Sequence, residues 1–110
     1  MLKIKQVEQI IIYELAKASI HKNFMNTVHL DDPFVLRTTR MNYKNNQKTV
    51  CIRIIRTNPL ASFASTEVVS TEIPFELFNC PNNIKLCVEH YIKAYRKVRN
   101  DYKKQSKVRK

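Results

Sequence analysis

The chain contains no glycine among its 110 residues. Glycine is the residue that usually fills left-handed backbone positions in tight turns and in phosphate-binding loops. Walker A loops, dinucleotide fingerprints, EF-hand loops and the Gly-x-Ser-x-Gly nucleophile elbow all depend on it. The sequence therefore excludes these kinds of site, and it leaves asparagine as the residue best suited to left-handed turns.

Size and charge fit one small cationic domain. The chain carries 20 Lys and Arg against 9 Asp and Glu, a formal charge of +11, and 44% of its residues are hydrophobic. A chain of this length matches one domain with a modest core. We predict a single α+β domain over residues 1–104 and a basic, disordered tail over residues 105–110.

Apolar residues spaced three and four apart indicate a helix at each end of the domain. The first helix is expected over residues 2–22, with the stripe Ile4, Val7, Ile11, Leu15 and Ala18. The last helix has the stripe Ile84, Val88, Tyr91, Ile92, Tyr95 and Val98. Asn82 or Asn83 is the expected cap of this helix. Ile10, Ile12 and Tyr13 widen the first stripe, which predicts cover on more than one side.

Three strands are expected between the helices, because β-branched residues alternate there with a period of two. They span residues 34–43, 49–57 and 65–73, with connectors over residues 23–33 and 74–83. The order is helix, three strands, helix, and the expected fold is a three-stranded antiparallel sheet packed by two helices. The predicted core consists of Ile4, Val7, Ile11, Leu15, Leu36, Val50, Ile52, Ile54, Val68, Val88, Tyr91, Ile92, Tyr95 and Val98.

The positive charge is concentrated in two segments. Residues 91–110 hold nine basic residues against Asp101, so nine minus one places +8 of the +11 there. The first two strands form the second concentration, with no acidic residue between Phe34 and Thr57. Arg37 and Arg53 are expected side by side on the outer face of the hairpin. Such segregation repels itself, and a polyanionic partner would relieve the repulsion.

We therefore expect a non-enzymatic nucleic-acid-binding protein that contacts phosphates, with DNA and RNA both left open. Tyr43, at the tip of the hairpin, could stack on a base. The predicted contact residues are Arg37, Arg40, Tyr43, Lys44, Lys48, Arg53, Arg56, Lys93, Arg96, Lys97, Arg99, Lys103 and Lys104.

Two other functions stay open at this point. The cationic face could meet an acidic protein surface, as in a virus- or mobile-element-encoded inhibitor or an assembly subunit, and the apolar first helix could form a homodimer. A nuclease would need Asp31, Asp32, Glu67 and Glu72 to converge. Cys51 could act as a nucleophile only with a nearby histidine, and none is close to it in the sequence.

No cofactor, metal site or membrane segment is predicted. Cys80, Cys87 and His90 are too few for a structural zinc site, and no Cys-x-x-Cys motif occurs. Three cysteines, an odd number without dense spacing, predict reduced thiols in an intracellular protein that is not secreted. Charged residues interrupt every apolar stretch long before a membrane span is reached.

The predicted order of elements over residues 2–104 resembles double-stranded RNA-binding domains and the small Alu-RNA-binding subunits of the signal recognition particle. The likeness to the second group includes a basic hairpin and the basic segment Tyr102-Lys103-Lys104-Gln105-Ser106-Lys107. The resemblance implies RNA binding by a compact α+β domain. The glycine-containing loop and the lysine cluster of double-stranded RNA-binding domains are absent, since the last helix begins Asn82-Asn83-Ile84-Lys85. No functional residue is therefore carried over.

Overall fold

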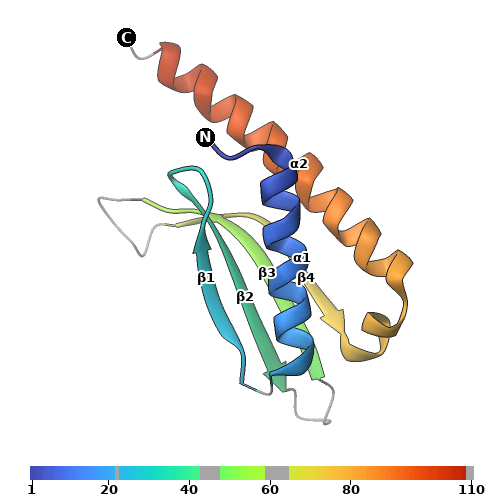
Figure 1. Cartoon of the computed structure of the whole chain (residues 1–110). Helices are drawn as coiled ribbons and strands as arrows, with labels where there is room; N and C mark the ends of the chain where they lie inside the picture. The colour runs from blue at the N-terminus through green and yellow to red at the C-terminus, as the bar shows by residue number, and fades with distance from the viewer. Residues whose placement is uncertain (22, 43–47, 59–64, 109–110) are drawn as a thin grey trace.

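The computed structural model describes residues 1–21, 23–42, 48–58 and 65–108 (Figure 1). The chain begins and ends with a helix, and an antiparallel sheet lies between them in the sequence. Both helices pack on the same face of that sheet (Figure 1). Over the described residues, neither helix is long and apolar enough to cross a membrane. In chain order the elements are α1 (Ile4–Ile20), β1 (Met25–His29), β2 (Phe34–Asn42), β3 (Lys48–Arg56), β4 (Thr66–Pro74), the 3-10 helix η2 (Phe75–Asn79) and α2 (Pro81–Val108).

The sheet has four strands in the order β1-β2-β3-β4, so the prediction of three strands is wrong. The additional strand, β1, lies within the segment predicted as a connector. It pairs antiparallel with β2, with Val28 opposite Leu36. Its five residues are Met-Asn-Thr-Val-His, in which alternate positions are half-buried. Only Val28 is both apolar and directed toward the core, so the apolar alternation was too short to detect.

The predicted hairpin of β2 and β3 is confirmed, and its register follows the predicted faces. Leu36 lies opposite Ile54 on the helix-covered face, and Arg37 lies opposite Arg53 on the other face. The pairing of β3 with β4 shifts by one residue at Ile54 and Ile55, which marks a β-bulge. The side of the sheet that carries Arg37 and Arg53 is called the open face below.

α1 packs through its predicted stripe, and one polar contact ties it to β1. Val7, Ile11 and Leu15 are fully buried. Glu14 is also buried, and its two carboxylate oxygens accept hydrogen bonds from the Asn26 amide at 2.9 and 3.0 Å. A buried carboxylate requires such a partner, so this contact fixes β1 beneath the helix.

α2 begins two or three residues earlier than predicted and ends later. Pro81 is its first residue, a position that suits proline because the first helical N–H needs no partner. The expected caps Asn82 and Asn83 therefore lie inside the first turn. The helix continues to Val108, past the predicted start of the tail at residue 105, because its lysine and glutamine residues are good helix formers.

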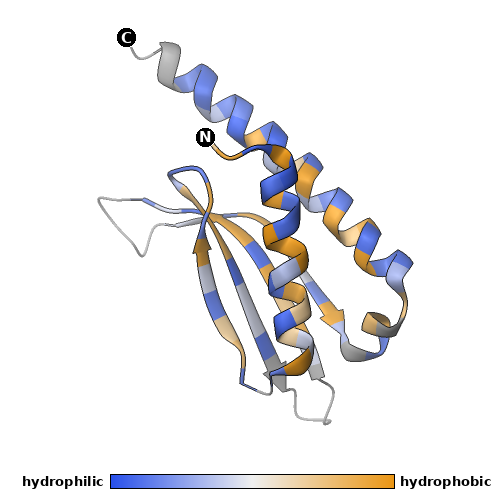
Figure 2. Cartoon of the chain, viewed as in Figure 1, coloured by the Kyte–Doolittle hydropathy of each residue, from blue (hydrophilic) through white to orange (hydrophobic). Residues whose placement is uncertain are grey.

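The core between the helices and the sheet agrees closely with the predicted one. The largest fully buried side chains include Tyr91 and Tyr95 of α2, and the Tyr91 hydroxyl donates a hydrogen bond to the Ile52 carbonyl oxygen. Alternating apolar and polar bands along the strands are visible in Figure 2. Of the predicted core, Val68, Ile92 and Val98 are only partly buried and pack against the cluster. Ile4 is half-buried and lies outside the cluster, so its assignment to the core was wrong. The C-terminal half of α2 is strongly hydrophilic and extends beyond the sheet (Figure 2).

Candidate nucleic-acid interface

Several exposed positive charges lie on the outer side of α2. Tyr91 and Tyr95 are completely buried and so define the side of the helix that faces the sheet. Lys93 and Lys97 each follow one of these tyrosines by two residues, which turns them by about 200° around a helix of 3.6 residues per turn. Lys104 lies in the same direction, two residues after the partly buried Tyr102. These lysines therefore point away from the sheet.

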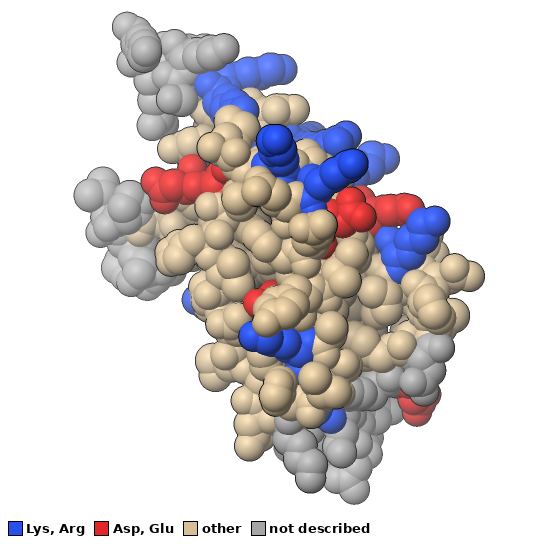
Figure 3. Space-filling model, viewed as in Figure 1, with Lys and Arg blue, Asp and Glu red and all other residues tan. Residues whose placement is uncertain are grey.

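Four exposed cations on this side form what we call the α2 cationic surface: Lys93, Arg96, Lys97 and Lys104. Within the described parts of the chain, none of the four forms an ion pair. From Lys93 to Lys104 the helix rises by about 17 Å at 1.5 Å per residue. Figure 3 shows Lys and Arg gathered mainly over the upper part of the molecule, where α2 runs in Figure 1. Asp101 is the exposed acidic residue nearest to them in the sequence.

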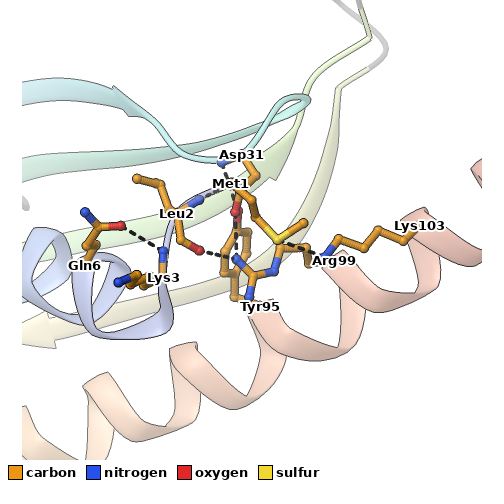
Figure 4. A network of polar contacts seen from close by, with 8 residues as sticks. All are labelled: Met1, Leu2, Lys3, Gln6, Asp31, Tyr95, Arg99 and Lys103. Carbon is orange, nitrogen blue, oxygen red and sulfur yellow. Dashed lines mark hydrogen bonds and ion pairs between the residues drawn. The ribbon is translucent and has the colours of Figure 1, made fainter.

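Arg99 is also on α2, but its side chain is used inside the fold. Its Nη1 atom lies 2.8 Å from the Asp31 Oδ2 atom and donates a second hydrogen bond, also 2.8 Å, to the Leu2 carbonyl oxygen. The side chains of Arg99 and Asp31 are only 12% and 14% exposed. Asp31 also accepts hydrogen bonds from the Leu2 N–H and from the Tyr95 hydroxyl, both 2.7 Å long (Figure 4). We call these four residues the Asp31 cluster.

The Asp31 cluster changes the acid–base properties of its members. Burial favours the neutral form of Asp31, but hydrogen bonds from Arg99, Leu2 and Tyr95 outweigh it and hold the pKa of the carboxyl below its ordinary value. Burial, followed by the hydrogen bond to Asp31, raises the pKa of the Tyr95 hydroxyl. The cluster thus contains an ionised carboxylate, a cation and a neutral phenol, and it joins the N-terminus to α2 (Figure 4).

Three further predicted contact residues have partners within the chain. The Arg40 Nη1 atom donates a hydrogen bond of 2.9 Å to the His21 carbonyl oxygen. The guanidinium of Arg56 lies 5.0 Å from the centre of the Tyr102 ring. The Lys103 Nζ atom lies 2.8 Å from the Met1 sulfur. The three side chains therefore contact other groups of the same chain instead of extending into solvent.

The remaining hairpin arginines lie on the open face, on the opposite side of the sheet from α2. Arg37 and Arg53 are directly opposite each other. Like charges in such pairs destabilise a sheet. Glu67 approaches Arg53 at 4.0 Å, and Glu72 occupies the same face opposite Cys51. The charges of these four side chains balance.

The fold does not join the two cationic segments of the sequence into one surface. The strand alternation that hides Leu36 beneath the helices also turns Arg37 away from them. The predicted contact residues Tyr43 and Lys44, and the side chain of Lys48, lie outside the described residues.

The four carboxylates considered for a nuclease are not gathered in one place. Asp31 is held by Arg99 at the N-terminus, whereas Glu67 and Glu72 lie on the open face. Throughout the described ranges, no three His, Cys, Asp or Glu side chains lie close enough together to hold a metal ion.

A groove between α1 and α2 is a feature that sequence reasoning missed. It has a volume of about 640 Å³ and runs beside the α2 cationic surface, because Lys93 and Arg96 belong to both. Its walls include Ile12 of α1 and Ile84 of α2. In the sequence, its only signal is that α1 has more apolar residues than one buried stripe requires.

Comparison of the chain with protein-family models, with curated proteins and with solved structures gave no match.

Proposed function

We propose that the protein binds nucleic acid non-enzymatically through phosphate contacts made by the α2 cationic surface. The observation that carries the proposal is the exposure of Lys93, Arg96, Lys97 and Lys104 on one side of α2, without an ion pair in the described chain. Their mutual repulsion destabilises the isolated protein, and phosphates that bind them release condensed counterions.

The length of this surface suits a phosphate backbone. Consecutive phosphates of one strand of duplex DNA are spaced by about 3.4 Å along the axis, so a path of about 17 Å passes about five of them. Arginine and lysine can both satisfy phosphate oxygens, and Arg96 adds planar, two-pronged donation. Arg99, Arg40 and Arg56 are left out of the proposed contact set, because each has a partner inside the fold.

Salt dependence gives the proposal a magnitude. Four phosphate contacts predict a slope of about −3.6 for log affinity against log salt, so affinity should fall about 150-fold between 50 and 200 mM salt. In the Lys97→Gln/Lys104→Gln variant the slope should be about −1.8, and the same change of salt should reduce affinity about 12-fold. Fluorescence anisotropy with a labelled DNA duplex measures both values, because these slopes take about 0.9 per phosphate contact, the factor for B-DNA.

A matched variant separates a dedicated surface from net charge. Lys5→Gln/Lys17→Gln removes the same two charges from α1, where neither lysine belongs to the α2 cationic surface. We expect its slope to stay near the wild-type value. Equal slopes for the two double variants would contradict the proposal, because they would show that only the total charge matters.

A second candidate is an interaction protein whose cationic side meets an acidic protein surface. It is favoured by apolar exposure on α1, where Ile12 is 45% and Tyr13 57% exposed, although Ile10 is partly buried against the core. Exposed apolar side chains that adjoin one another are typical of partner sites. A chain that fails to bind any oligonucleotide at 50 mM salt would favour this candidate, and size-exclusion chromatography would then test for the homodimer.

A further inference from the structure

The groove between the two helices combines an aliphatic interior with charged side chains at its margins. Its aliphatic residues come from both helices, and Lys93 and Arg96 form the part that it shares with the α2 cationic surface. The acidic residues Glu8 and Glu89 also line it. The aliphatic lining consists of Ile4, Ile12, Ile84, Val88 and Ile92.

We propose that this groove accepts unpaired nucleobases of a single strand whose phosphates lie on the α2 cationic surface. The proposal rests on the function proposed above, and it names single-stranded nucleic acid as the preferred ligand. A backbone held by Lys93 and Arg96 passes along the margin of the groove, so its bases reach the aliphatic walls without leaving those cations. Bases bury their apolar faces against apolar side chains in known recognition pockets.

The charges in the groove fit bases better than phosphates. Glu8 and Glu89 are both exposed and repel a phosphate from the interior. Carboxylates accept hydrogen bonds from the exocyclic amino group of cytosine. Lys85, at the far end of the groove, can donate to a base oxygen or to the next phosphate. The arrangement therefore separates a place for phosphates from a place for bases.

A duplex cannot use the groove in the same way. Its bases are paired and stacked, and bringing one into the groove requires unpairing and unstacking. The duplex is then held by phosphate contacts alone. Stacking on aromatic side chains is worth at least about a fivefold change in affinity per base, and we expect a similar gain for a base against these aliphatic walls.

The test compares three ligands of equal length at one salt concentration: a 20-nucleotide DNA strand, its duplex, and an abasic phosphodiester strand. Wild-type protein should bind the intact single strand at least fivefold more tightly than either of the others. Ile12→Gln should remove this preference while leaving the duplex affinity and the salt slope unchanged, because it alters no charge. Leu86→Gln is the matched control, since Leu86 is 63% exposed on α2 and does not line the groove.

Each result leads to a distinct conclusion. Equal affinity of the wild type for the three ligands would overturn the base-binding inference and leave phosphate binding intact. Absence of binding to all three would overturn both proposals. If Ile12→Gln instead halved the mass measured by analytical ultracentrifugation without nucleic acid, the groove would hold a second copy of the chain, and the inference would be wrong. The abasic comparison requires no variant, so it stands even if Ile12→Gln fails to fold.

Discussion

Replacement of Asp31 by asparagine should destabilise the protein substantially. The change keeps the size of the side chain and removes its charge, which leaves the Arg99 guanidinium without its partner at 2.8 Å. Because the two side chains are only 14% and 12% exposed, water cannot fully replace the lost contact. Breaking a fully buried ion pair on one side costs at least about 3 kcal/mol, so about 3 kcal/mol is the upper limit expected for this partly buried pair.

This loss should appear as a shift of up to roughly 12 °C in Tm, at about 4 °C per kcal/mol for a domain of this size. Urea denaturation followed by circular dichroism gives the free energy directly. Asp32→Asn provides the control, because the neighbouring Asp32 is exposed, and its replacement should change stability by less than about 0.5 kcal/mol.

The same pair predicts how stability depends on pH. The pKa of Asp31 is lower in the folded protein than in the unfolded chain, so its contribution is complete above the unfolded pKa and is lost as pH falls through the folded pKa. The gap between wild type and Asp31→Asn should therefore be full at pH 6 and should shrink below about pH 4. A gap under about 1 kcal/mol at pH 6, or one that does not change with pH, would refute a structural role for the ion pair.

Two further predictions concern tyrosine and cysteine side chains. Burial raises the pKa of the Tyr91 and Tyr95 hydroxyls well above 10, so the contribution of these two groups to stability should be constant below pH 10 and should be lost as pH rises further. In an absorbance titration these two tyrosines should ionise only as the protein unfolds. Early ionisation of all tyrosines would show that the two hydroxyls are accessible to water. With Ellman's reagent, exposed Cys80 should react quickly, buried Cys51 only after unfolding, and Cys87 slowly, because burial raises the pKa of its thiol. Three equally fast thiols would contradict this order.

The helices and the central strands could be predicted because their periodicity records which side is buried. The stripe through Tyr91 and Tyr95 and the alternation through Ile52 and Ile54 both specify faces that the structure confirms. β1 could not be predicted in this way, because one of its two inward positions is Asn26. Asn26 is stabilised at this inward position by its hydrogen bond to the buried Glu14 carboxylate, which belongs to α1.

The candidate site was less accessible to sequence reasoning than the fold. Local sequence shows that Arg99 belongs to a basic segment, but its partner Asp31 lies 68 residues away. The same limit applies to the α1–α2 groove, which exists only once two helices distant in sequence are packed together. The charge of a segment can be read from its own residues. Whether a charge is paired, and whether a groove forms, depends on residues that only the folded chain brings together.

The outermost strands of the sheet have a consequence for self-association. β1 is only five residues long, and β4 carries outward glutamates at positions 67 and 72, a bulge in its pairing with β3 and a terminal Pro74. Short length, charge, bulges and proline are the features by which natural edge strands avoid pairing with strands of other molecules. Extension of this sheet into a continuous intermolecular ladder is therefore disfavoured at both margins, so contacts between copies should use the helices.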